Sequence, residues 1–161
     1  MFNNHSTSFE KFWSILTFIL IILIVFLVGS AKGDPMVIQN DFFEAISFVE
    51  SSHNPHAIGD NGKAYGIYQI RKAYLADGNR IAGTNYTLND MLDPAKARVI
   101  MEAYIFHYGN IALRKKYPNG FTYEQAIEVL SRIHNGGPRG YMKSSTKKYW
   151  NRVSKACKNN N

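Results

Sequence analysis

The feature that most constrains the fold is a long stripe of apolar side chains with helical spacing in the middle of the chain. It begins after Asp93-Pro94, which combines a side-chain acceptor at the N-cap with proline at the first helical position. An apolar face of this length has to be buried against other elements, so we expect a long central helix. The stripe consists of Ala97, Ile100, Met101, Tyr104, Ile105, Tyr108, Ile111 and Ala112.

Shorter signals of the same kind flank this segment. Phe42, Ile46 and Val49 have helical spacing, and the turn-forming residues 51–55 end that segment. Residues 122–125 form a capping box before another apolar stripe, and residues 145–156 form a basic segment anchored by apolar side chains. The stretch 56–70 is rich in glycine, asparagine and aspartate, which predicts a turn or short hairpin. The sequence therefore predicts a mainly helical α+β domain with one small β-hairpin.

The N-terminal part has a different character. Residues 12–28 are apolar except for Ser14 and Thr17. This stretch is longer than a usual signal-peptide core of ~7–15 residues and just short of a membrane span of ~20 residues. Small residues follow at 29–33, where a signal peptidase could cleave. We interpret 1–33 as a signal peptide or signal anchor and 34–161 as the folded domain, either secreted or membrane-anchored. A buried core helix is the poorer alternative, because no polar residues give the segment a solvent face.

Charge and cysteine content narrow the possible partners and sites. The net charge of +7 favours anionic partners such as nucleic acid, anionic lipid or an anionic cell wall, without choosing among them. The single cysteine, Cys157, excludes an intramolecular disulfide and a cysteine-based metal site; we interpret it as a spare thiol on a frayed tail. No second histidine has metal-site spacing from His134, so neither a metal nor another cofactor is expected.

Two carboxyl groups are candidates for catalysis. Glu50 lies four residues after Ile46 at the end of the first helical segment, and therefore over the apolar face. Burial disfavours a charged carboxylate, so we expect a raised pKa for Glu50, as a general acid near neutral pH requires. Asp60, in the polar loop, is expected to stay ionised, and such a contrasting pair is what glycoside hydrolysis uses. The alternatives are an exposed helix-end glutamate and an aspartate that only shapes a turn.

Two further stretches could bind a substrate. The stretch 65–70 offers Tyr65 and Tyr68 as flat faces for sugar rings, Gln69 as a hydrogen-bonding group, and Gly66 as a place where a backbone or a sugar can approach closely. The glycines of the stretch 134–140 predict a loop at a helix end, from which the side chains of His134, Asn135 and Arg139 would project. For His134 the alternative is a purely structural hydrogen bond.

Taken together, these residues resemble the invertebrate-type (destabilase-like) lysozymes. The resemblance runs from about Asp41 to Val153 and rests on Glu50-Ser51, the loop with Asp60, Gly66-Ile-Tyr-Gln-Ile70, Ala73-Tyr74, and above all Arg132-Ile-His-Asn-Gly-Gly-Pro-Arg-Gly140 with Tyr149-Trp-Asn-Arg-Val153. The first half also resembles bacterial lytic transglycosylases. The invertebrate-type lysozymes are rich in disulfides, so a member with one cysteine has to be stabilised by its core alone.

The resemblance implies a lysozyme-like fold in which a small β-hairpin faces a helical lobe. It also implies a muramidase that cleaves bacterial peptidoglycan, with Glu50 as the acid and Asp60 as the second carboxylate of a retaining mechanism. The alternatives are a lytic transglycosylase and a non-catalytic peptidoglycan-binding module. Between Arg139 and Lys158 there are seven basic residues and no acidic one, so this segment could contact an anionic wall polymer or lipid. A nucleic-acid partner is not expected.

Overall fold

The computed structural model describes residues 38–159. The segment interpreted as a signal peptide or anchor (1–33) and the expected start of the domain at residue 34 therefore lie outside the described residues. The described part is one compact unit. None of its helices combines the length and the apolar character that crossing a membrane requires.

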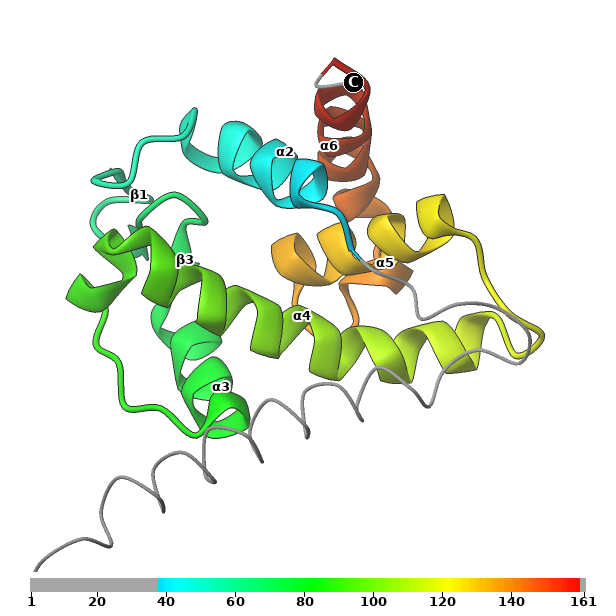
Figure 1. The fold of residues 1–161 in the computed structure, drawn as a ribbon, viewed down its shortest axis with the longest axis horizontal. Coiled ribbons are helices and arrows are strands. Elements are labelled where there is room, and N and C mark those ends of the chain that lie inside the picture. Colours follow the sequence, from blue (N-terminus) through cyan, green and yellow to red (C-terminus); the bar gives the residue numbers. More distant parts are fainter. Residues whose placement is uncertain (1–37, 160–161) are drawn as a thin grey trace, which may run out of the picture. The chain divides into compact units, whose positions relative to one another are not determined.

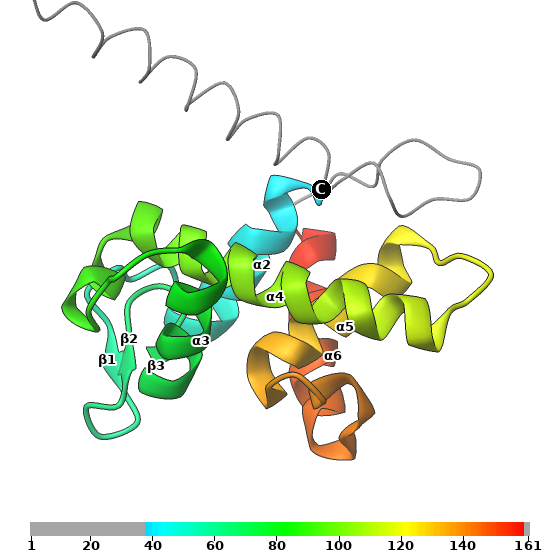
Figure 2. The same ribbon diagram turned by 90° about the horizontal axis from the view of Figure 1, so that it is seen from below.

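The unit is mainly helical, with a small antiparallel sheet near its beginning (Figure 1). The strands and α3 lie at one end of the long helix α4, and α5 and α6 lie toward its other end, as both views show (Figures 1 and 2). The predicted fold class, helical with a small β region beside a helical lobe, is confirmed. In chain order the elements are α2 (Asn40–Ser51), β1 (Ile58–Gly59), β2 (Ala64–Tyr65), β3 (Ile70–Arg71), α3 (Lys72–Ala82), η1 (Asn89–Leu92), α4 (Pro94–Lys116), α5 (Tyr123–Gly136), η2 (Gly140–Met142), η3 (Ser144–Thr146) and α6 (Lys147–Asn159).

The central helix α4 begins as the sequence predicts. The Asp93 side chain accepts hydrogen bonds from the backbone N–H groups of Ala95 and Lys96, at 2.8 and 3.3 Å. The predicted stripe is buried from Ala97 to Ile105 and again at Ala112, but the prediction is wrong for Ile111, which is 60% exposed. The reason is that the last turns of α4 pack on α5, where the helix buries Gly109 and Leu113 together with Ala112. The buried face has therefore rotated around the helix.

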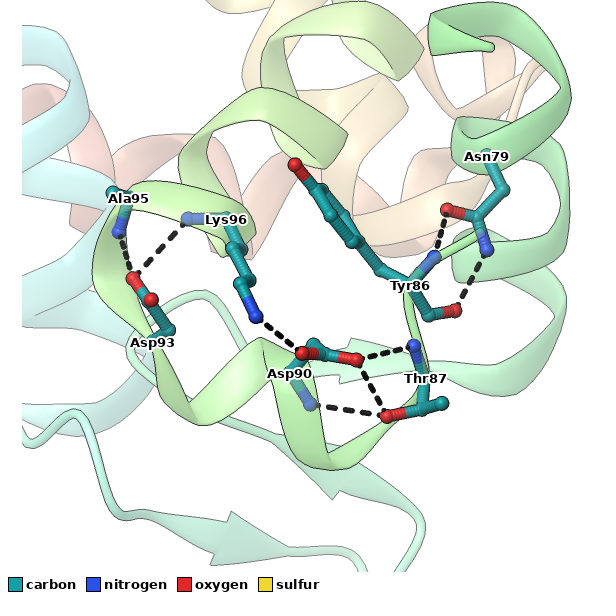
Figure 3. Close-up of polar contacts among 7 residues, drawn as sticks. All are labelled: Asn79, Tyr86, Thr87, Asp90, Asp93, Ala95 and Lys96. Carbon is teal, nitrogen blue, oxygen red and sulfur yellow. Dashed lines mark hydrogen bonds and ion pairs between the residues drawn. The ribbon is translucent and has the colours of Figure 1, made fainter. Parts of the chain in front are cut away.

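The connection from α3 to α4 is held by side chains that bond to backbone (Figure 3). The Asn79 side chain donates to the carbonyl of Tyr86 at 2.8 Å and accepts from the Tyr86 N–H at 3.0 Å. Asp90 accepts from the N–H and hydroxyl of Thr87 and forms an ion pair with Lys96 at 2.5 Å. These contacts hold the pKa of Asp90 well below its usual range, chiefly through the Lys96 hydrogen bond. The loop before α4 is thereby tied to both neighbouring helices.

The predicted hairpin is confirmed, and a third strand extends it. The sheet has the order β1-β2-β3, with Ile58 opposite Tyr65 and Tyr65 opposite Ile70. The turn between β1 and β2 uses positive φ angles at Asp60, Asn61 and Gly62, of 49°, 53° and 83°. Asparagine, aspartate and glycine tolerate that region best, which explains why this sequence forms the turn here.

The C-terminal helix completes the core. Helix α5 starts with the predicted capping box at Thr122 and Gln125, and α6 packs against both α5 and α2. Cys157 is 8% exposed on α6, so its interpretation as a thiol on a frayed tail is wrong. The cause is the amphipathic pattern of α6, which turns Val153 and Cys157, one turn apart, toward the core.

Candidate active site

Glu50 lies in the last turn of α2. The face of α2 that carries Phe42, Phe43 and Ile46 is buried in the core. The helix ends in a left-handed residue, Ser52, whose N–H bonds to the carbonyl of Phe48 at 2.9 Å. The side chain of Glu50 is 18% exposed. As the sequence predicts, this carboxyl group is largely buried yet still reaches solvent.

A buried histidine contacts the Glu50 carboxylate. Nε2 of His134 lies 3.4 Å from Oε1 of Glu50, and Nδ1 of His134 lies 3.1 Å from the hydroxyl of Tyr74. The Tyr74 ring in turn stacks on Tyr104 of α4, with centroids 3.7 Å apart. If the Tyr74 hydroxyl donates to Nδ1, the proton of the ring sits on Nε2 and faces Glu50. A chain of contacts thus runs from Glu50 of α2 through His134 of α5 and Tyr74 of α3 to Tyr104 of α4.

The position of His134 corrects a prediction. We expected this side chain to project from a glycine-rich loop, but it belongs to the last turn of α5 and is 4% exposed. The glycines do end the helix, with Gly137 at φ 81°. They do so one turn later than the histidine, so His134 points inward while Asn135 next to it is exposed.

The pKa of Glu50 differs from the expectation in direction. Burial by itself raises it, as predicted, but the contacts with His134, Tyr149 and Arg152 outweigh burial and leave the pKa below its ordinary value. The same carboxylate and burial raise the pKa of Tyr149 well above its ordinary range, and its buried hydroxyl has no partner of hydrogen-bond geometry among the described residues. The expectation of a raised pKa fails because it considered only burial.

Asp60 occupies the turn between β1 and β2. Its carboxylate pairs with Arg71 of β3 at 3.2 Å, and its side chain is 41% exposed. This is the solvated setting that the sequence predicts. No hydrogen bond or ion pair among the described residues joins Asp60 to Glu50, so any joint action of the two carboxyl groups takes place across a bound substrate.

The stretch 65–70 serves the fold more than the surface. Tyr68 is 4% exposed, which is contrary to the expectation that its ring faces a sugar. Gln69 donates to the carbonyls of Ala57 and Gly66, at 3.2 and 2.9 Å. Gly66 lies against the backbone carbonyl of Met91, so the close approach expected here is made by backbone. Tyr65 on β2 is partly exposed.

A groove runs from Glu50 to the C-terminal helix. It lies between the end of α2 and α6 and has a volume of about 480 Å³. Arg152 of α6 donates to the backbone carbonyl of Val49 at 2.8 Å and so links the two helices. The residues that line the groove are Phe48, Val49, Glu50, Ser51, Ser52, Arg152, Lys155 and Ala156.

Sequence reasoning did not place Tyr74, Tyr149 and Arg152 in the site. Each lies far from Glu50 along the chain, and nothing local in the sequence marks them as its neighbours. The signal that could have found them is their position inside the two stretches of family resemblance, Ala73-Tyr74 and Tyr149-Trp-Asn-Arg-Val153.

The arrangement suits proton transfer. A partly buried carboxyl group with one open side can give a proton to a bound atom and take it back, while a buried histidine fixes its orientation. Among residues 38–159, no group of three or more histidine, cysteine, aspartate or glutamate side chains is placed to hold a metal ion.

Comparisons with known proteins show which family the chain resembles. The family model described as the transglycosylase SLT domain matches residues 30–117, a range that includes Glu50 and Asp60. The chain is 32% identical to invertebrate-type lysozyme 6 of Caenorhabditis elegans, over 71% of this chain and 84% of that one. It is 34% identical to lysozyme 1 of Crassostrea virginica and to the lysozyme of Ostrea edulis, but these matches span only 45% and 56% of the oyster proteins.

A solved structure has the same fold. A chain in the crystal structure of Aeromonas hydrophila PliI in complex with Meretrix lusoria lysozyme superposes with a TM-score of 0.56 and 28% sequence identity. The superposition covers 78% of this chain and 93% of that one.

Proposed function

Because the chain belongs to the invertebrate-type lysozymes and is a peptidoglycan-degrading enzyme of the glycosidase type, we propose that it hydrolyses the β-1,4 bond between N-acetylmuramic acid and N-acetylglucosamine with Glu50 as its proton donor. The observation that carries this proposal is the setting of Glu50. This carboxyl group is 18% exposed at a helix end and is oriented by a buried histidine at 3.4 Å. No other glutamate on α2 has comparable surroundings, since Glu44 is half exposed.

The lowered pKa of Glu50 in the free protein has a consequence for the mechanism. A general acid has to carry a proton when the substrate is bound. A glycan lying over the open side of Glu50 removes the remaining water and strengthens burial, which is the effect that raises this pKa. Substrate binding and protonation of Glu50 therefore favour each other. Glu50 then gives its proton to the leaving glycosidic oxygen.

Asp60 is proposed as the second carboxylate of a retaining reaction. It would attack the anomeric carbon, or stabilise the positive charge there, and Glu50 would then activate water. Its side chain is 41% exposed and pairs with Arg71, so it is accessible to a bound glycan. Tyr65 and Asn135, both accessible, are the remaining candidates for contacts with the sugar. Retention predicts that the first product released has the β configuration, which NMR of a freshly cleaved oligosaccharide measures directly.

The test of the function compares the purified chain with its Glu50→Gln variant on purified peptidoglycan, with products read by mass spectrometry. We expect reducing-end muropeptides from the wild type and a loss of about 10²–10⁴-fold in rate from the variant. Glu44→Gln is the matched control, because it removes a half-exposed glutamate from the same helix. A folded wild-type chain that binds peptidoglycan and releases no fragments would refute the enzyme and leave a wall-binding module.

A second candidate is favoured by the transglycosylase SLT family match. A lytic transglycosylase needs the catalytic glutamate but no second carboxylate, and its 1,6-anhydro products are lighter by one water. The same mass spectra separate the two reactions. Hydrolysis further predicts that Asp60→Asn is strongly impaired, whereas a transglycosylase would tolerate that change.

We also propose that residues 1–33 direct the chain to export, after which residues 34–161 act on bacterial walls outside the producing cell. The exposed lysines and arginines of α6 support an added contact with an anionic wall polymer or lipid. N-terminal sequencing of the exported protein would identify the first residue of the mature chain.

A further inference from the structure

We propose that the groove between α2 and α6 binds the carboxylates of the peptide that peptidoglycan carries on N-acetylmuramic acid, with Lys155 and Arg152 as the groups that recognise them. This inference rests on the proposed function, because it assigns the part of the substrate that extends away from the bond at Glu50. It assigns to α6 a role in substrate recognition in addition to its role in the fold.

The groove has the size and the composition for a short peptide. Its volume of about 480 Å³ is in the range of ordinary ligand sites. Phe48, which is 53% exposed, and Ala156 give it an apolar side. An exposed aromatic ring beside cations suits a ligand that has both small apolar side chains and carboxylates, as the wall peptide does.

The two cations of the groove form no ion pair with an acidic side chain among the described residues, although Arg152 lies near enough to Glu50 to lower its pKa. The Arg152 guanidinium is held against α2 by its hydrogen bond to the carbonyl of Val49. Lys155 follows three positions later on α6, so both side chains leave the same face of the helix. No ion pair among the described residues involves either side chain, and α6 contains no acidic residue. When Glu50 carries its proton as the acid, the groove holds two positive charges and no negative one.

The location beside Glu50 determines which anion reaches these charges. The bond that Glu50 would protonate joins C1 of N-acetylmuramic acid to the next sugar, and the wall peptide is attached to O3 of that same muramic acid ring. A sugar placed for proton transfer therefore brings the attachment atom of its peptide close to Glu50, within reach of the groove.

A binding experiment tests the assignment separately from catalysis. The ligand is the disaccharide-peptide N-acetylglucosaminyl-N-acetylmuramyl-peptide, which lacks the bond that a muramidase cuts. Its affinity for the full chain is measured by titration calorimetry, once with free carboxylates and once with the carboxylates amidated. We expect the ligand with free carboxylates to bind more tightly than the amidated ligand, by about two- to five-fold for each ion pair that it forms with the groove. We expect Lys155→Gln to reduce that preference by the factor of one ion pair, because Arg152 remains.

Lys158→Gln is the matched control. It removes the same charge from the same helix, but Lys158 does not line the groove. This variant is expected to keep the wild-type preference. An equal loss in both variants would show a diffuse effect of surface charge and overturn the proposal. Equal affinities of the two ligands for the wild type, or no measurable binding of either, would overturn it as well. Because the cleavage assay on peptidoglycan is independent of this titration, a failure here leaves the proposed muramidase activity standing.

Discussion

Two glycines of the β region have positive φ angles but different surroundings. Gly62, at φ 83°, has open space where a Cβ would lie. Gly66, at φ 73°, would place a Cβ onto the backbone carbonyl of Met91 in η1. The first position therefore needs glycine for its backbone conformation only. The second needs glycine also because backbone from another element occupies the space.

This difference predicts unequal costs of alanine. Gly62→Ala is expected to lower the free energy of unfolding by about 1 kcal/mol, the cost of a left-handed alanine. Gly66→Ala is expected to cost about 3 kcal/mol or more, because η1 has to move in addition. Urea denaturation of the two variants beside the wild type measures both values. Equal losses would mean that the approach of Met91 does not constrain Gly66.

Among the elements, α4 depends most clearly on Asp93, the N-cap residue just before it. Asp93 accepts two backbone N–H groups that would otherwise lack partners at the start of the helix. We expect Asp93→Ala to lower the free energy of unfolding by about 1 kcal/mol, whereas Asp93→Asn, which keeps the accepting oxygen, stays close to the wild type. Thermal unfolding followed by circular dichroism compares the two. A large loss in the asparagine variant would assign the effect to charge and not to capping.

Elements with local signals are the ones that the sequence predicts well. Helices α2, α4 and α5 each combine an apolar stripe with a cap or a breaker, and the Asp-Asn-Gly turn marks the hairpin. Helix α3 was not predicted, because it has Gly78 in its middle and no side-chain cap at its start. That glycine is needed because Ile100 of α4 packs where its Cβ would be, and the segment's own sequence does not reveal a requirement set by another helix.

The site follows the same logic. Glu50 could be found because its helix alone turns it toward the core. Its pKa could not, because the groups that lower it belong to α5 and α6. The hydrogen bond between Tyr74 and His134 joins residues 60 positions apart, and only the folded chain brings them together. Sequence reasoning therefore predicted the partial burial of this carboxyl group and mistook its electrostatic surroundings.

For the molecule as a whole, Glu50 links stability to pH. A carboxyl group whose pKa is lower in the folded chain stabilises the fold above its unfolded pKa, and this contribution is lost as the pH falls through the folded value. We expect the wild type to exceed Glu50→Gln in unfolding free energy by more at pH 7 than at pH 3. Urea denaturation at both pH values measures the difference. Glu44→Gln controls for the loss of one negative charge, and a gap that widens toward pH 3 would contradict the prediction.

The burial of Cys157 makes the rate of its chemical modification a measure of how often α6 opens. The side chain is 8% exposed, and burial raises the pKa of its thiol to about 11, so the reactive thiolate is scarce while α6 stays docked on α2. A thiol-specific reagent therefore reacts only after α6 opens locally. Because Cys157 is the one cysteine in the sequence, the reaction reports on this helix alone. Since α6 also forms one side of the groove beside Glu50, the rate of modification of this thiol also reports how often that side of the groove opens.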